Sequence, residues 1–235
     1  MVKKIKFTCT IKGTPLIKFQ TKQLINFLQQ GSFYMSSLKR YRDMYANSGD
    51  EIIGDPHEGR LCIHCASIFL PESDDRIIKI RDEALPTVSE NDFVFCMFGI
   101  IPPNLGVFRF TEEQKSKLAE TYDTALIIKD QNEFIKRINS QAKANGINIK
   151  YGFVKYYDES FDEASRLCSI SEKEIDSVAF HKRNKYAYQQ EYRFVVKNRD
   201  ANQLYYEMNI GDISDISEQL PSVDVLNALL TMESI

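Results

Sequence analysis

The chain lacks the apolar runs by which membrane proteins are recognised. None approaches the roughly 20 residues that a helix needs to cross a bilayer, so we expect no membrane segment. The basic residues 1–6 are followed by an apolar stretch that is too short and too interrupted for the core of a signal peptide. We therefore expect a cytoplasmic protein.

Several catalytic fingerprints are also missing. The sequence contains no Walker-type phosphate loop, no Rossmann glycine fingerprint and no nucleophile elbow. Histidine occurs three times, and no pair of acids has the spacing expected of a hydrolase. A catalytic triad or a two-carboxylate glycosidase is therefore not expected.

Cysteine is scarce and odd in number, with five residues that mostly lie in apolar runs. Thiols in such runs pack as small hydrophobic side chains. The stretch Cys62-Ile-His-Cys65, with His57 nearby, would suggest zinc. In a strand, however, Cys62 and His64 share a face while Cys65 points away, and no second Cys/His pair at finger spacing follows. We expect no metal here.

What the chain does contain is typical of a folded globular protein, with 43% hydrophobic and 11% aromatic residues. Its net charge of −3 is unevenly distributed, because residues 199–235 carry seven acidic groups and one basic group. We expect a catalytic or ligand-binding α+β domain over residues 1–198, with an acidic strand and helix over residues 199–235 packed on it. The acidic segment is a candidate contact for a partner.

The hydrophobic periodicity predicts helices and strands intermixed without βαβ order, in a single domain whose mixed or antiparallel sheet is flanked by helices. The uniformly apolar residues 92–101 should form a central strand covered on both faces. Residues 191–196 and 204–210 are predicted to form a hairpin. Further strands are expected at residues 4–11, 33–35, 60–70, 76–81, 124–129 and 148–157. Helices are expected at residues 21–30, 36–49, 112–122, 131–145, 171–177 and 223–230.

Residues 31–42 combine a short strand, paired serines and basic side chains. A strand that feeds a helix through Ser36 and Ser37 presents backbone N–H groups and hydroxyls to a phosphate, and Arg40 and Arg42 supply charge. An ordinary serine-capped helix with solvated basic residues accounts for the same pattern.

The loop Gly54-Asp-Pro-His-Glu-Gly59 uses two glycines and a proline to fix an irregular backbone. It presents Asp55, His57 and Glu58, and shaped loops of this kind often serve a site. A loop held by its own side-chain hydrogen bonds is the alternative. Whether Asp55 and Glu58 bind a metal stays open, since their spacing matches no calcium loop.

The most informative segment is residues 180–196, where a polar stretch turns into an apolar, strand-like run. Gln189 and Glu191 alternate along an extended segment, so both side chains should reach the same face. The segment forms either a site for an anionic, ring-bearing ligand or an edge strand with a salt-bridged surface. Cations and tyrosines surround the single carboxylate, namely His181, Lys182, Arg183, Lys185, Arg193, Tyr186, Tyr188 and Tyr192.

The three motifs and the apolar strand follow one another along the chain in an order that resembles an uncharacterised bacterial family from mobile and phage-defence loci. The resemblance covers about residues 20–196. The last motif is also similar to the C-terminal acid segment of DNA-targeting ADP-ribosyltransferase toxins. This resemblance implies an ADP-ribosyltransferase-like fold, NAD as substrate, and a nucleic acid or protein as acceptor. It implies that Glu191 is the catalytic acid and that Gln189 orients the acceptor. The residues it implies for NAD binding are Tyr34, Ser36, Arg40, Arg42, His57 and Tyr186, with Tyr34 or Tyr186 stacking on the nicotinamide.

The leading prediction is thus an ADP-ribosyltransferase-like enzyme that modifies a macromolecule in bacterial defence or as a toxin. One alternative is a non-catalytic defence module that senses a nucleotide or binds a partner, with the cations and aromatics binding phosphate and bases. The other alternative is a magnesium-dependent nuclease that uses Asp55, Glu58, Lys185 and Glu191.

Overall fold

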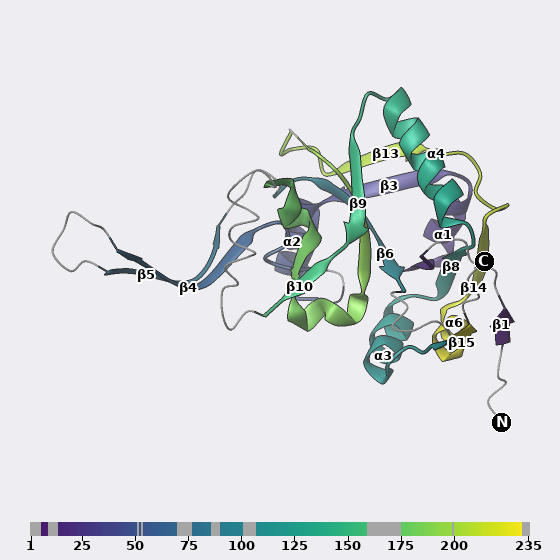
Figure 1. Cartoon of the computed structure of the whole chain (residues 1–235), viewed down its shortest axis with the longest axis horizontal. Coiled ribbons are helices and arrows are strands. Elements are labelled where there is room, and N and C mark those ends of the chain that lie inside the picture. Colours follow the sequence, from purple (N-terminus) through teal and green to yellow (C-terminus); the bar gives the residue numbers. More distant parts are fainter. Residues whose placement is uncertain are drawn as a thin grey trace.

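The computed structural model describes residues 6–8, 14–50, 52, 54–69, 77–85, 90–100, 107–158, 175–198 and 200–231. Within these ranges, eight strands form one antiparallel sheet (Figure 1). Its strands are β2 (Leu16–Gln20), β3 (Ser32–Ser37), β6 (Phe93–Gly99), β8 (Thr124–Ile128), β9 (Ile149–Phe153), β12 (Glu191–Val196), β13 (Tyr205–Asn209) and β14 (Ser217–Pro221). The predicted α+β fold of a single domain is confirmed.

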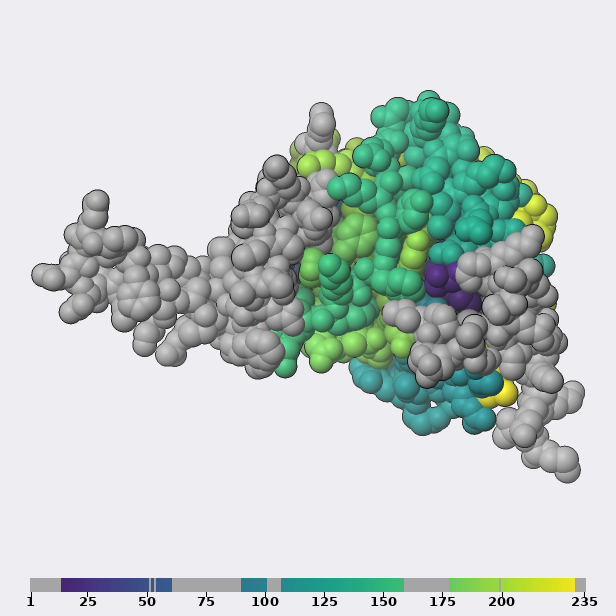
Figure 2. Space-filling model, in the orientation of Figure 1, coloured from purple at the N-terminus to yellow at the C-terminus, as the bar shows by residue number. Residues whose placement is uncertain are grey.

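Helices cover both faces of this sheet. One face packs against α1 (Lys22–Gln29) and α4 (Gln131–Ala144). The opposite face packs against α2 (Leu38–Ser48), α3 (Glu112–Thr121) and α6 (Ser222–Asn227). In the space-filling view of Figure 2, the teal and green atoms of α4 and the strands that follow it form much of the described surface. None of the helices in the described ranges has the length and apolar character needed to cross a membrane.

Small sheets and short helices complete the described fold. Strand β1 (Lys6–Thr8) pairs with β15 (Leu229–Thr231), which also pairs with β7 (Val107–Phe108). Two further pairs are β4 (Leu61–Phe69) with β5 (Ile77–Leu85), and β10 (Lys155–Tyr157) with β11 (His181–Arg183). Two 3₁₀ helices, η1 (Ile175–Phe180) and η2 (Asn184–Gln189), flank β11. Both precede β12 and bring the polar segment against the sheet.

Strand β6 is the centre of the sheet, as its apolar sequence predicts. It pairs with β12 along one edge, and six of its seven residues are buried. The side chains of Phe93, Phe95 and Met97 enter the core beneath α4, while those of Val94 and Phe98 enter the cores on the opposite face. The expectation of a strand covered on both faces is confirmed.

The other edge of β6 is shared by two strands that part from each other. Strand β3 pairs with Phe93 and Val94, whereas β2 pairs with Phe98 and Gly99. Cys96 lies between these two pairings, and it is the one residue of β6 that is partly exposed. Along this edge, the sheet is therefore divided at the middle of its central strand.

Helix α2 begins and ends where its sequence indicates. The Ser37 side chain accepts a hydrogen bond from the backbone N–H of Arg40 (3.2 Å), and Gly49 ends the helix in the left-handed region at φ 68°. The predicted serine cap is confirmed. The helices predicted at residues 21–30, 112–122 and 131–145 are also present, as α1, α3 and α4.

One predicted strand pairing is wrong, and two predicted elements are present with other bounds. Strands β12 and β13 form no hairpin, because β12 lies between β6 and β9 while β13 pairs with β3. The Asn198 N–H donates to the Asp92 carboxylate (3.0 Å), and this contact anchors the chain as it leaves β12. The predicted helix at 223–230 ends at Asn227, and the next residues join β15. The strand predicted at 148–157 is divided at Val154 into β9 and β10.

One expected helix falls partly outside the described residues, and the structure also contains strands that were not predicted. Most of the helix predicted at 171–177 lies outside the described residues, and its end belongs to η1. Strands β2 and β14 had no counterpart in the prediction. Residues 200–231 supply β13 and β14, which pair with β3 and β8, so part of the acidic segment is built into the main sheet.

The core beneath α4 is centred on Phe194, which is 0% exposed. Its ring centre lies 5.6 Å from that of Phe33 and 5.9 Å from that of Phe134. We predict that Phe194→Ala lowers the free energy of unfolding by about 3–5 kcal/mol, because it removes buried area and leaves a cavity. Urea denaturation measures this change. The matched control is Phe27→Ala, whose ring is 47% exposed; an equal loss in both variants would contradict the assignment of this core.

Candidate functional site

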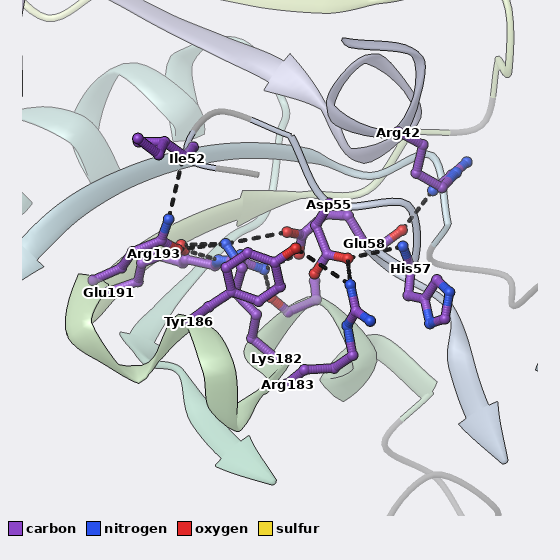
Figure 3. Close-up of polar contacts among 12 residues, drawn as sticks. Arg42, Ile52, Asp55, His57, Glu58, Lys182, Arg183, Tyr186, Glu191 and Arg193 are labelled. Atoms are coloured by element: carbon purple, nitrogen blue, oxygen red, sulfur yellow. Dashed lines mark hydrogen bonds and ion pairs between the residues drawn. The ribbon is translucent and has the colours of Figure 1, made fainter. Parts of the chain in front are cut away.

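Six ionisable residues lie together on the sheet face opposite α4, and we call them the charge cluster. Each is at most 8% exposed. They come from β12, from β11 and from the loop after α2, and Figure 3 shows their polar groups directed toward one another. The members are Asp55, Glu58, Lys182, Arg183, Glu191 and Arg193.

Glu191 lies at the centre of the charge cluster, at the first position of β12. Its Oε1 accepts a hydrogen bond from Lys182 Nζ (2.7 Å), and its Oε2 accepts one from Arg193 Nε (2.6 Å). Its backbone N–H donates to the hydroxyl of Tyr156 (2.9 Å). The carboxylate is thus held in one orientation by two cations and a fixed backbone.

The loop at residues 54–59 supplies the other two carboxylates. Glu58 Oε1 accepts from Arg193 Nη1 (2.8 Å), and Glu58 Oε2 lies 3.4 Å from Lys182 Nζ. Asp55 Oδ1 accepts from Arg183 Nη2 (2.6 Å). Gly59 ends the loop at φ 69°, where a Cβ would lie 2.7 Å from the Leu38 side chain.

Arg42 fixes this loop from the side of α2. Its Nη1 donates to the backbone carbonyls of Glu58 and Glu90, both at 2.6 Å. The predicted phosphate-binding arginine is therefore brought to the charge cluster, where its guanidinium bonds to the main chain of the loop. This side chain connects α2 to the loop of the charge cluster.

The charged side chains of the cluster shift one another's pKa. Burial alone would raise the pKa of Glu191, but the charges of Arg193 and Lys182 and their hydrogen bonds hold that pKa well below its usual value. Burial alone would lower the pKa of Lys182, but the carboxylates of Glu191 and Glu58 raise it. Glu191 is therefore an anion, and Lys182 a cation, at neutral pH.

Gln189 and Glu191 reach a common partner, although not along an extended segment. Gln189 ends η2, and Gln190 turns the chain in the left-handed region at φ 40° before β12 begins. Lys182 Nζ donates to Gln189 Oε1 and to Glu191 Oε1, both at 2.7 Å. The expectation of an extended Gln189–Glu191 segment is wrong, because the turn at Gln190 separates the two residues.

Tyr186 is buried beneath the cations and is 2% exposed. The Lys182 and Lys185 ammonium groups lie 4.7 and 5.1 Å from its ring centre, and the Arg183 guanidinium carbon lies 5.4 Å from it. Its hydroxyl accepts a hydrogen bond from Arg183 Nη2 (3.2 Å). The ring faces the side chains of the chain itself, and these contacts are of the cation–π kind.

Three more of the predicted contacts to NAD, Tyr34, Ser36 and Arg40, lie outside the charge cluster. Tyr34 is 37% exposed, its ring stacks on Tyr205 at 5.2 Å, and its hydroxyl accepts a hydrogen bond from Arg40. Ser36 lies on β3 opposite Tyr205. Within the described residues, no hydrogen bond or ion pair joins these side chains to the cluster. In Figure 3 the ring of His57 points away from Glu191, while its backbone N–H donates to Asp55 Oδ1 (2.9 Å).

Lys182 and Arg193 were expected around Glu191 but without a role in catalysis or NAD binding, and both contact Glu191 directly. Arg193 is two positions after Glu191 on β12, so the alternation of a strand places both on one face. That signal was present in the sequence. The contact with Lys182 carries no such signal, since it depends on the turn through η2.

The three carboxylates proposed for a nuclease are brought together, but each faces a cation. Lys182 is the lysine of the cluster, whereas Lys185 is exposed. Among the residues that the structure describes, no three His, Cys, Asp or Glu side chains are placed to hold a metal ion. The side chains of Cys62 and Cys65 lie outside the described part of the chain.

Comparison with known proteins gives no relative. No protein-family model, curated protein or solved structure matches the chain.

The low pKa of Glu191 makes stability depend on pH. An unfolded glutamate titrates near pH 4.3 and folded Glu191 well below it, so the unfolded chain takes up the proton first as the pH falls. We predict that the free energy of unfolding decreases below about pH 5 by up to roughly 1.4 kcal/mol per pH unit from this residue. Urea denaturation between pH 3.5 and 7 measures the slope.

Glu191→Gln should make that slope shallower and, at neutral pH, lower the stability by about 3–5 kcal/mol, because two buried cations lose a partner. The control is Glu133→Gln, since Glu133 also has a lowered pKa but lies at the surface of α4. A Glu191→Gln slope equal to that of the parent would contradict the prediction.

Proposed function

We propose that the protein is an ADP-ribosyltransferase-like effector that takes NAD as substrate and transfers ADP-ribose to a nucleic acid or protein acceptor. We place it in the cytoplasm, in a defence or toxin setting, with residues 199–235 as a contact for a partner. One observation carries the proposal. An ionised carboxylate, Glu191, is fixed at the start of a central strand, and Gln189 is held by the same ammonium group.

The proposed role of Glu191 follows from its charge. As nicotinamide leaves, positive charge develops at the ribose carbon, and a fixed anion beside that carbon stabilises the transition state. Because its pKa is held low, the Glu191 carboxylate is ionised at neutral pH and can stabilise this positive charge. For the same reason it is poorly suited to donate a proton. Gln189, on the same ammonium, is proposed to orient the acceptor.

Two of the candidate NAD contacts lie on the same side of the sheet as Glu191, which supports this proposal. On β3, Phe33 and Met35 enter the core beneath α4, so Tyr34 and Ser36 point to the opposite face. On β12, Tyr192 enters the same core, and Glu191 points to the opposite face. Tyr34, Ser36 and Glu191 are therefore on one side of the sheet, which is the side of α2.

Access to Glu191 sets a condition on the mechanism. The residue is 7% exposed, and both carboxylate oxygens already have a partner. A ribose hydroxyl that donates to Glu191 would use a second lone pair of one oxygen or replace one of these partners. Where a partner is replaced, we propose that it is Lys182, because its ammonium keeps Gln189 as a partner, whereas Arg193 is fixed by Glu58 and the Ala179 carbonyl.

The burial of Glu191 and the pairing of both its oxygens favour a second candidate function. In this alternative, the protein is a nucleotide-binding module without turnover. Each oxygen of the Glu191 carboxylate already has a hydrogen-bond partner within the protein, as buried polar groups usually do. In this alternative, ligand binding at the charge cluster is read out by a partner, and no bond is broken.

The test is nicotinamide release from NAD by the purified protein. We predict that Glu191→Gln reduces the rate by about 100-fold or more, as expected when an electrostatic stabiliser is lost. Glu218→Gln, at an exposed position of β14, should keep the parental rate. Glu191→Asp keeps the charge on a shorter side chain and should retain part of the activity.

Circular dichroism must show that each variant is folded. Parental release by a folded Glu191→Gln would refute the enzymatic proposal. If calorimetry detects NAD binding while mass spectrometry detects no product in the presence of candidate acceptors, the second candidate replaces the first.

A further inference from the structure

The side-chain amide of Gln189 can be oriented in only one way. Lys182 Nζ, which can only donate a hydrogen bond, lies 2.7 Å from one end of the amide. The carbonyl of Ile52, which can only accept one, lies 3.2 Å from the other end. The end beside Lys182 is therefore the oxygen Oε1, and the end beside Ile52 is the nitrogen Nε2. These two neighbours remove the usual ambiguity between the oxygen and the nitrogen of a side-chain amide.

The hydrogens of this amide are used within the protein. Gln189 Nε2 donates to the Ile52 carbonyl and to the Tyr188 hydroxyl, each at 3.2 Å. An amide nitrogen carries two hydrogens, so neither is left for a ligand. The oxygen Oε1 has two lone pairs, and within the described residues Lys182 is its one hydrogen-bond donor. Toward a ligand, Gln189 is thus an acceptor only.

The ammonium of Lys182 has no hydrogen to spare either. It donates to Gln189 Oε1 and to Glu191 Oε1, both at 2.7 Å, and lies 3.4 Å from Glu58 Oε2. Its three hydrogens therefore face three oxygens. Lys182 and Glu191 are 8% and 7% exposed, whereas Gln189 is partly exposed. Of these side chains, Gln189 is the one that a ligand can reach from solvent without displacing a member of the charge cluster.

The charge beside Gln189 adds a second condition. Glu191 is an anion, and its Oε1 shares the Lys182 ammonium with Gln189 Oε1. A carboxylate that approached Gln189 would face a lone pair on Oε1 and the negative charge of Glu191, and both repel it. A group with an N–H or O–H brings the hydrogen that Oε1 accepts.

We propose that Gln189 determines the specificity of the site, by selecting an acceptor whose reacting group carries an N–H or O–H and by rejecting a carboxylate. This deepens the proposed function and rests on it only in calling the selected group the acceptor. In the transfer, the acceptor oxygen or nitrogen bonds to the ribose carbon. Nicotinamide leaves with the electron pair of its bond to that carbon, and the acceptor proton passes to water.

The test compares two small probes of nearly the same shape. Acetamide carries N–H hydrogens, whereas acetate carries a negative charge and no such hydrogen. Each is titrated into the full chain at neutral pH and fixed ionic strength, while NMR follows the backbone N–H resonances of residues 189 and 191. Gln189→Met removes the amide, and Gln189→Glu keeps an accepting oxygen without the N–H groups. The matched control is Gln141→Met, because Gln141 is a partly exposed glutamine on α4.

We expect acetamide to bind the parent and Gln141→Met within twofold of each other, and acetate to bind both at least tenfold more weakly. Gln189→Met should bind acetamide at least tenfold more weakly than the parent, and Gln189→Glu within a few-fold of it. If Gln189 served only to hold Tyr188 and Ile52, both substitutions would remove its N–H groups, and an equal loss in the two would overturn the inference. Acetate binding as strong as that of acetamide, or no acetamide binding to the parent, would overturn it as well.

Failure of this inference and failure of the proposed function are separable. Neutral hydroxylamine cleaves the ester that a carboxylate acceptor would form, but it leaves ADP-ribose on a hydroxyl or an amide nitrogen. If NAD is not cleaved but acetamide binding still requires Gln189, the donor-selecting site stands and the proposed function falls. If NAD is cleaved and hydroxylamine releases the transferred ADP-ribose, this inference falls while Glu191 retains its role.

Discussion

The guanidinium of Arg193 joins three segments that are far apart in the chain. It donates to Glu191 on its own strand, to Glu58 of the loop after α2 and to the carbonyl of Ala179 in η1 (2.5 Å). Arg193 is 1% exposed, so these bonds form where water does not compete. Removing such a charge from water costs several kcal/mol, and only a complete set of partners offsets the cost. The loop, η1 and the start of β12 are consequently placed relative to one another by a single side chain.

The same argument explains why the charge cluster contains equal numbers of acids and cations. A buried carboxylate without its cation would take up a proton, and a buried cation would lose one. Each member therefore depends on the others for its charge.

Local signals in the sequence predicted local structure well. The serine cap and the glycine at the end of α2 are contacts within a few residues, and the position of β6 follows from its uniformly apolar sequence. The hairpin prediction failed because pairing between strands is decided by contacts across the fold. Asn198 bonds to Asp92, a residue 106 positions earlier, and the chain then runs to β3 instead of returning along β12. The site was predicted in part, since the alternation of β12 indicates Arg193, but the contact between Glu58 and Arg193 spans 135 positions and leaves no pattern in the sequence.

The distance in sequence between Glu58 and Arg193 has a consequence for biosynthesis. The loop with Asp55 and Glu58 leaves the ribosome long before the cations that neutralise it, which lie at residues 182–193. Because closing such long loops costs chain entropy, contacts of this range form late in folding. Until then the acidic loop stays hydrated, and no partial chain that ends before β12 contains the site. The charge cluster therefore assembles only after residues 182–193 have been synthesised.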